Sequence, residues 1–409
     1  MIHINERTNE FHLQNEKISY VFRVMEQLEV LEQLYFGSRI PIYETYDFLI
    51  EREIRPSNNQ LAEDHTTSLE HIKQELGIYG TTDFRYPMLR IRYENGDRIS
   101  QFTYAGYRIV KGKKSSVGLP GTFGEEGETL IITLQDAYSL LQVELFYTIF
   151  PDSGVITRQM KVLNPSSITY ELLDCMSFNL DLPNQNYDWL HLDGAWARET
   201  QLSRTPLNYG VQEVSSTRGA SSHVHNPFLA LCTKETTEHQ GEAYGFSLIY
   251  SGNFLARIQV DTYDILRVQM GINPFEFCWQ LTGQSEFLTP EAVLVYSDTG
   301  LNGMSQTFHE FFTEHLINPY WAHKRRPVLI NNWEATYFDF SSEKLLQIAE
   351  KAAEIGVELF VLDDGWFGQR NSDKGSLGDW SVQKEKLPEG IARLAQKING
   401  LGLEFGLWF

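Results

Sequence analysis

Acidic and indole side chains follow three successive apolar runs near the end of the chain. Trp333 comes just after the first run, Asp363 and Asp364 directly follow the second, and Trp408 closes the third. An ionised carboxylate only accepts hydrogen bonds and can take two hydroxyl donors, whereas an indole offers a flat apolar face. These residue types suit the binding of a sugar, although a pair of acids can also simply cap a turn.

The segment from 327 to 409 has the pattern of strand, helix, strand, helix and strand. We predict its strands at 327–331, 358–362 and 403–409, with amphipathic helices between them. Ser341 or Ser342 can begin the first helix and Gly356 can end it. Because strands joined through a helix run parallel, their carboxyl ends share one edge, where such sheets bind ligands. The spacing therefore predicts that Trp333, Asp363, Asp364 and Trp408 lie together at one edge of the sheet.

Composition narrows the classes of partner. The formal net charge of the 409 residues is -20 at pH 7, which argues against nucleic acid or an anionic membrane as partner. No apolar run is long enough to span a bilayer, and the N-terminus lacks the pattern of a secretion signal. Three dispersed cysteines, Cys175, Cys232 and Cys278, indicate reduced thiols. We expect a cytoplasmic protein.

From the start of the chain to about residue 300 the apolar residues alternate with a period of two. This pattern, with tight turns between the runs, predicts stacked antiparallel sheets in a large sandwich. The pair Asn95 and Gly96 predicts a hairpin with a type I′ turn. We predict a β-sandwich domain at 1–300, a helical linker at 301–320 and an α/β domain at 321–409.

Long motifs rich in aromatic residues are spread along the whole chain. Toward the C-terminus they are Asn331–Phe338, Leu362–Phe367, Leu377–Trp380 and Phe405–Trp408. Upstream they are Tyr79–Arg85, Tyr187–His191, Gly194–Trp196, Arg218–His223, Tyr250–Phe254 and Met270–Phe275. Together they resemble the motifs of the bacterial α-galactosidases of glycoside hydrolase family 36, over nearly the whole chain.

The resemblance implies an N-terminal β-supersandwich followed by a (β/α)₈ TIM barrel, of which this chain holds the first three strands. It implies retaining hydrolysis of terminal non-reducing α-D-galactosyl residues, as in melibiose and raffinose. The implied partner is therefore a galactoside substrate. The resemblance also implies that the full-length protein is a homo-tetramer. We expect no cofactor and no metal.

The family's binding residues can be carried over position by position. Asp363 and Asp364 match the acids that hold the O4 and O6 hydroxyls of galactose, and Trp333 and Trp408 match the tryptophans that wall the galactose pocket. By the same resemblance all four are substrate-binding residues.

Two further residues come from the N-terminal part of the chain. Trp196 matches a sandwich tryptophan that closes the site. Glu51 stands about where the family has an Asp that reaches the pocket of a neighbouring subunit. The resemblance makes both of them substrate-binding residues as well.

The two adjacent acids are not a catalytic pair. A retaining glycosidase needs two carboxyl groups about 5–5.5 Å apart on opposite sides of the scissile bond, and neighbours on one strand end cannot straddle a sugar in that way. In the family the nucleophile lies in a Lys-Trp-Asp motif on a later strand, and this sequence has no such motif. We predict that the chain is a fragment, that the nucleophile and the acid/base lie beyond Phe409, and that the fragment alone is inactive.

Other functions remain open at this stage. The chain could be a non-catalytic sugar-binding or assembly module, one half of a split enzyme, or a galactosyl transferase on the same fold. His223 and His225 share one face if they lie on a strand, but the sequence shows no third ligand beside them. We therefore predict no metal site there.

Overall fold

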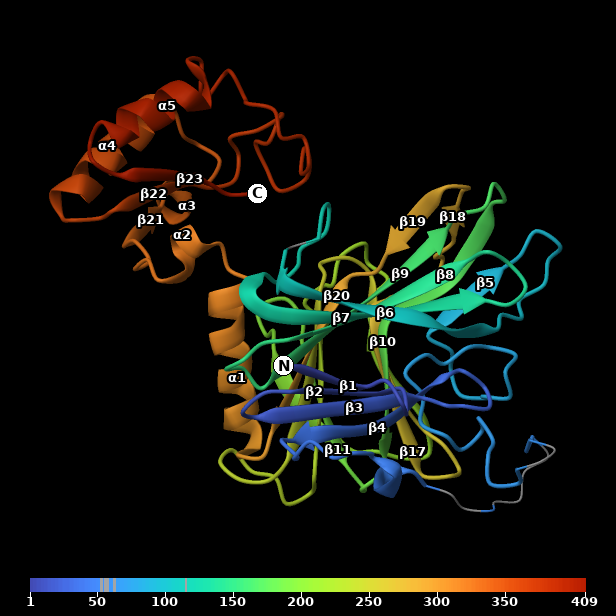
Figure 1. The fold of residues 1–409 in the computed structure, drawn as a ribbon. Helices are drawn as coiled ribbons and strands as arrows, with labels where there is room; N and C mark the ends of the chain where they lie inside the picture. The colour runs from blue at the N-terminus through green and yellow to red at the C-terminus, as the bar shows by residue number, and fades with distance from the viewer. Residues whose placement is uncertain (52–53, 55–58, 62–63, 115) are drawn as a thin grey trace. The chain divides into compact units, whose positions relative to one another are not determined.

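The computed structural model describes residues 1–51, 54, 59–61, 64–114 and 116–409. The chain divides into two compact units, Met1–Ala322 and His323–Phe409. Antiparallel sheets build the first unit, and a small parallel sheet with helices builds the second (Figure 1). The division into a sheet-rich part and a smaller α/β part agrees with the alternation of apolar residues in the sequence.

Three sheets make up the first unit in the described part of the chain. The four-stranded sheet has the order β1-β2-β3-β4, with β1 Ile2–Asn5, β2 Glu10–Gln14, β3 Ile18–Val24 and β4 Leu31–Ser38. The six-stranded sheet has the order β13-β16-β17-β10-β18, with β5 beside β10; its strands are β5 Leu89–Arg92, β10 Tyr170–Pro183, β13 Gly210–Ser215, β16 Phe254–Val260, β17 Ile265–Ile272 and β18 Trp279–Leu281. The ten-stranded sheet has the order β12-β11-β14-β15-β20-β9-β8-β7-β6, with β19 beside β9; its strands are β6 Phe102–Lys113, β7 Gly124–Asp136, β8 Gln142–Ile149, β9 Val155–Asn164, β11 Asp188–Asp193, β12 Gln201–Pro206, β14 His225–Cys232, β15 Ala243–Ile249, β19 Ser285–Leu288 and β20 Glu291–Ser297. A 3-10 turn, η1, spans Asp47–Leu49.

The two smaller sheets pack on the ten-stranded sheet and form a β-sandwich. Phe22 of β3 stacks on Tyr147 of β8 with ring centroids 4.9 Å apart. Phe178 of β10 stacks on Phe246 of β15 at 5.6 Å. All four rings are fully buried in one continuous hydrophobic core. The alternating apolar pattern is therefore the inward face of each strand.

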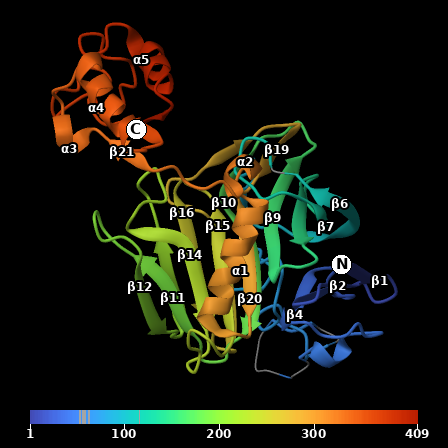
Figure 2. The same ribbon diagram turned by 90° about the vertical axis from the view of Figure 1, so that its left-hand side faces the viewer.

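A single long helix covers part of the other face of the ten-stranded sheet. Helix α1, Gly300–His315, lies along β15 and β20, as Figure 2 shows. Its Met304, Phe308 and Phe311 are buried there. A Cβ at Gly245 of β15 would lie 2.5 Å from the Phe308 ring, so this close approach requires glycine. The short helix α2, Pro319–Ala322, follows.

The second unit is a three-stranded parallel sheet in the order β21-β22-β23. Its elements are β21 Leu329–Asn331, α3 Trp333–Thr336, α4 Ser342–Glu354, β22 Leu359–Leu362, α5 Gly390–Asn399 and β23 Glu404–Leu407. The Ser341 side chain accepts a hydrogen bond from the backbone N–H of Lys344 and caps α4, as the sequence predicts. Gly356, with φ +87°, follows the helix end. None of the helices in the described ranges combines the length and apolar character that a bilayer span requires.

The hairpin predicted at Asn95 and Gly96 is wrong. The chain does turn there, because the Gly96 N–H donates to the Tyr93 carbonyl oxygen and Gly96 has φ +86°. The flanking strands do not pair with each other, however, since β5 pairs with β10 and β6 pairs with β7. The turn therefore connects strands that belong to two different sheets.

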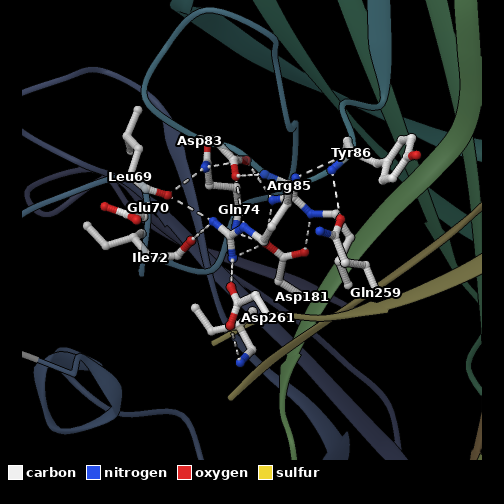
Figure 3. A network of polar contacts seen from close by, with 12 residues as sticks. Leu69, Glu70, Ile72, Gln74, Asp83, Arg85, Tyr86, Asp181, Gln259 and Asp261 are labelled. Atoms are coloured by element: carbon white, nitrogen blue, oxygen red, sulfur yellow. Dashed lines mark hydrogen bonds and ion pairs between the residues drawn. The ribbon is translucent and has the colours of Figure 1, made fainter. Parts of the chain in front are cut away.

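A buried network of charges holds the loop before β5 against β10 and β17. The Arg267 guanidinium donates from Nε and Nη2 to the two oxygens of Asp181, at 2.7 Å each. Arg85 lies between Asp83 and Asp181 (Figure 3), with Nε 2.8 Å from Asp83 and Nη1 3.3 Å from Asp181. Burial alone would raise the pKa of Asp181, but the charges of Arg267 and Arg85 hold it below the ordinary value. The carboxylate is therefore ionised although no part of it reaches solvent.

We expect Asp181→Ala to lower the free energy of unfolding of the first unit by about 3 kcal/mol at pH 7, because two buried arginines lose their shared carboxylate. Since the folded-state pKa of Asp181 is lowered, its stabilisation is complete above the ordinary Asp value of about 4 and is lost as pH falls through the lowered value. Urea unfolding measures the change. The exposed Asp152→Ala serves as control and should stay within about 0.5 kcal/mol. Equal stabilities of the two variants would contradict the expectation.

Candidate functional site

The carboxyl ends of the three parallel strands meet at one edge of the second unit. Asn331 of β21 is in register with Val361 of β22, and Leu362 is in register with Leu407 of β23. The residues that directly follow these three strands therefore lie next to one another along this edge of the sheet. The Asp363 N–H donates to Oδ1 of Asn332 at 2.8 Å, and the Trp408 N–H donates to the Leu362 carbonyl oxygen at 2.9 Å. Hydrogen bonds thus connect all three strand ends.

We call Asn331, Asn332, Asp363, Asp364 and Trp408 the strand-end rim. Asp363 is half-buried at its centre. Its Oδ2 accepts a hydrogen bond from the Asn331 amide, and its Oδ1 accepts one from the Asp364 N–H at 2.7 Å. A carboxylate has about four lone-pair positions, so Asp363 is held in one orientation and retains acceptor capacity for hydroxyl donors.

Asp364 is bound differently. Arg370 donates to it from Nε at 2.9 Å and from Nη2 at 2.8 Å, in a two-pronged ion pair. Asp364 is 7% exposed and Arg370 6% exposed. The hydrogen bond to Asp364 raises the pKa of Arg370 above its ordinary value. This pairing uses part of the hydrogen-bond acceptor capacity of the Asp364 carboxylate.

A second cation lies beside this ion pair. Lys386 donates from Nζ to the carbonyl oxygens of Gly365 and Arg370, each at 3.0 Å. Burial lowers the pKa of Lys386, while the charge of Asp364 acts in the opposite direction. The two cations tie the loop after β22 to the carboxylate and to the backbone around it.

Aromatic rings line the edge beside the acids. The Trp366 indole donates from Nε1 to the Trp408 carbonyl oxygen at 2.9 Å. Trp380 packs against Phe367 at 4.5 Å and Phe409 at 5.3 Å between ring centroids. Trp408 remains 36% exposed and Trp380 43% exposed. Indole surface therefore stays open at the edge that carries the two acids, and an apolar ring face can pack on such a surface.

The structure brings together some of the predicted site residues. Asp363, Asp364 and Trp408 share the rim. The N–H of Trp333 joins the same edge by donating to Oδ1 of Asn331 at 2.7 Å. The Trp333 ring is half-buried and packs edge-on against Phe338, with centroids 5.0 Å apart.

Trp196 and Glu51, the other two predicted site residues, belong to the first unit. Trp196 is 85% exposed in the loop between β11 and β12. Glu51 is exposed, and its Oε1 lies 3.3 Å from Nζ of Lys73 in an ion pair. Their role in binding stays a prediction.

Arg370 and Asn332 also belong to the site, although the sequence motifs did not identify them as site residues. Asn332 is fully buried and accepts a hydrogen bond from the Asp363 N–H. Its position inside an aromatic motif at a strand end could have identified it as a site residue. Arg370 lies six residues after Asp364 in a loop without periodicity, so only the folded loop reveals the pair.

The sequence of this chain is similar to known proteins over nearly its whole length. Residues 29–282 match the family model described as the glycosyl hydrolase family 36 N-terminal domain, and residues 286–409 match the Melibiase model. Alpha-galactosidase AgaA of Geobacillus stearothermophilus is 48% identical over 407 residues, which cover 99% of this chain and 56% of that protein. The chain thus spans about half the length of the curated relatives it matches.

Solved structures have the same fold as this chain. The crystal structure of an α-galactosidase from Lactobacillus brevis has a TM-score of 0.95 at 45% identity, covering 100% of this chain and 55% of that one. A variant of the Geobacillus stearothermophilus AgaA, crystallised with raffinose, has a TM-score of 0.92 at 49% identity and covers 98% of this chain and 56% of its own.

We expect Arg370→Leu to destabilise the second unit by about 3 kcal/mol, because the buried carboxylate of Asp364 loses the guanidinium that is hydrogen-bonded to it. Urea unfolding followed by tryptophan fluorescence measures the loss. Arg393→Leu, which removes an exposed arginine of α5, is the matched control and should change stability by about 0.5 kcal/mol or less.

The double variant Asp364→Leu/Arg370→Leu should recover much of the loss, because removing both charges costs less than leaving one of them buried alone. A double variant less stable than Arg370→Leu would show that the ion pair is not the source of the effect.

Proposed function

The chain belongs to glycosyl hydrolase family 36, and from that membership we propose that the whole protein is a retaining α-galactosidase. It would remove terminal non-reducing α-D-galactosyl residues from melibiose and raffinose-type oligosaccharides. One observation carries the proposal: two carboxylates directly follow β22 at the edge formed by three parallel strands, where Trp408, whose backbone N–H donates to Leu362, keeps part of its indole exposed. Ligands bind at this edge of parallel α/β sheets.

In this proposal the strand-end rim binds the galactosyl ring. Asp363 and Asp364 accept hydrogen bonds from the O4 and O6 hydroxyls, with Asn331 and Arg370 fixing the orientation of the two carboxylates. Trp333 and Trp408 wall the ring. Charged acceptors suit this task because hydrogen bonds to ionised groups are stronger than neutral ones.

We propose that β21, β22 and β23 are the first three strands of a (β/α)₈ TIM barrel, with residues 321–409 as part of the catalytic domain, 1–300 as the supersandwich and 301–320 as the helical linker. The parallel crossovers through α4 and α5 support this architecture. The proposed homo-tetramer would let Trp196 and Glu51 of one subunit edge the pocket of another. The 85% exposure of the Trp196 side chain supports that role.

The catalytic carboxylates belong, in this proposal, to parts of the whole protein outside these 409 residues. Asp363 and Asp364 are neighbours on one strand end, where the first is bonded by Asn331 and the second by Arg370. Two such groups cannot attack from one face of a sugar while protonating from the other. Their task is binding, and the double displacement needs two further acids.

In the whole protein, Asp363→Asn should lower kcat/KM for melibiose about 10–100-fold, because an amide removes the charged acceptor and brings a donor toward the sugar hydroxyls. Initial rates over a range of melibiose concentrations give the value. Asp373→Asn, an exposed aspartate of the same loop, is the control and should leave kcat/KM unchanged. If the two variants were equally active, the binding role of Asp363 would be excluded.

The 409-residue chain by itself should give no turnover of p-nitrophenyl α-D-galactopyranoside, since the acids at its strand-end rim do not flank a glycosidic bond. The whole protein, assayed at the same molar concentration, is the positive control. Release of p-nitrophenol by the pure 409-residue chain would place the catalytic carboxylates within it and refute this part of the proposal.

A further inference from the structure

Two histidines and an aspartate meet where β11 and β14 adjoin in the first unit. His191 and Asp193 stand two residues apart on β11, so their side chains lie on one face of the sheet. His225, the first residue of β14, is directly opposite Asp193 in the antiparallel register. The pairing of the two strands therefore places all three side chains on adjoining positions of one face.

The distances within this cluster are short. Nδ1 of His191 lies 2.8 Å from Oδ1 of Asp193, and Nδ1 of His225 lies 3.0 Å from the same oxygen. One ligand atom from each of the three residues lies within 4.8 Å of the other two. The other carboxylate oxygen of Asp193 accepts a hydrogen bond from the hydroxyl of Ser203. All three side chains are half-buried, so solvent reaches the cluster.

Asp193 accepts hydrogen bonds at both carboxylate oxygens, from the Ser203 hydroxyl at one and from the two imidazoles at the other. His191 packs on the ring of Trp189 with centroids 4.3 Å apart, which limits the positions of its imidazole. The cluster thus combines a carboxylate that is held at both oxygens with two imidazoles beside it.

We propose that His191, Asp193 and His225 form a divalent-cation site of the zinc type, with two imidazole nitrogens and one carboxylate oxygen as ligands. Ligands at about 2.0–2.2 Å from a tetrahedral zinc ion lie about 3.3–3.6 Å from one another. The two spacings between an imidazole nitrogen and Asp193, 2.8 and 3.0 Å, would have to open slightly, and all three ligand atoms already lie within 4.8 Å of one another. Imidazole with a single carboxylate selects Zn²⁺, Co²⁺ or Ni²⁺ over Mg²⁺ and Ca²⁺, which prefer all-oxygen shells. Water completes the shell from the solvent side.

The cation would fix one end of each of two loops. Asp193 ends β11 just before the loop 194–200 that presents Trp196, and His225 begins β14 just after the loop 216–224. The loops are already packed together at Gly194, where a Cβ would lie 2.6 Å from the carbonyl oxygen of His223 and 2.8 Å from Cα of Glu199. Bound metal would restrain the backbone on both sides of this contact.

Titration calorimetry with Zn²⁺ on the chelator-treated 409-residue chain tests the site. We expect one saturable equivalent per chain, and a dissociation constant at least about tenfold higher in His225→Gln and in Asp193→Asn, since each removes one of three ligands. His223→Gln is the matched control, because it removes a histidine two residues away from His225. Cys278→Ser removes an exposed thiol that could bind zinc by itself. Both controls should bind as the parent chain does.

A second readout does not depend on calorimetry. Co²⁺ bound to a tetrahedral site absorbs in the visible range, and Zn²⁺ should abolish that absorption while millimolar Mg²⁺ should not. Thermal unfolding of each metal-free variant reports whether it folds, and His191→Gln replaces His225→Gln if the latter does not. Three results would overturn the proposal: no saturable Zn²⁺ binding, equal affinity in His225→Gln and Asp193→Asn, or loss of binding in His223→Gln.

Discussion

The strand-end rim depends on the parallel pairing of β21, β22 and β23. Helices α4 and α5 carry the chain back across the sheet after each strand, so every strand of the unit ends at the same edge. Asn332, Asp363 and Trp408 are far apart in sequence and become neighbours for this reason alone. Hydrogen bonds then hold the backbone of these residues in place: the Asp363 N–H donates to the Asn332 side chain, and the Trp408 N–H donates to the Leu362 carbonyl oxygen. Rigid strand ends are a suitable base for groups that must meet a ligand in one geometry.

The first unit positions its functional candidates in another way. Its antiparallel strands leave loops at both ends, and side chains rather than the sheet restrain them. Asp181 with its two arginines holds the loop before β5. The cluster of His191, Asp193 and His225 lies at the base of the loop that carries Trp196. Both arrangements use charged groups on paired strands beside a loop, and in both the energy depends on complete partnering of those groups.

Local patterns predicted much of this fold. The alternating Leu141, Val143, Leu145 and Tyr147 are fully buried, as expected of a core-facing strand, and the helical spacing around Ser341 located α4 within one or two residues.

Contacts set by long-range register were not predictable. His225 meets Asp193 across 32 residues of chain, and only the pairing of β11 with β14 brings it beside His191 and Asp193. The hairpin expected at Asn95 failed for the same reason, since the turn residues do not specify the sheet that each flanking strand joins. Arg370 was missed because loops carry no periodic signal.

Above all, we propose that the rim beside β22 binds a hexose through carboxylate acceptors. A crystal structure of the whole protein with a bound galactose-based inhibitor tests this most directly. We predict that the O4 and O6 hydroxyls lie about 2.5–3.0 Å from the carboxylate oxygens of Asp363 and Asp364, the range of O–H···O hydrogen bonds, with the Trp408 indole against the ring. An inhibitor bound away from this edge, or one whose hydroxyls contact neither carboxylate, would contradict the claim.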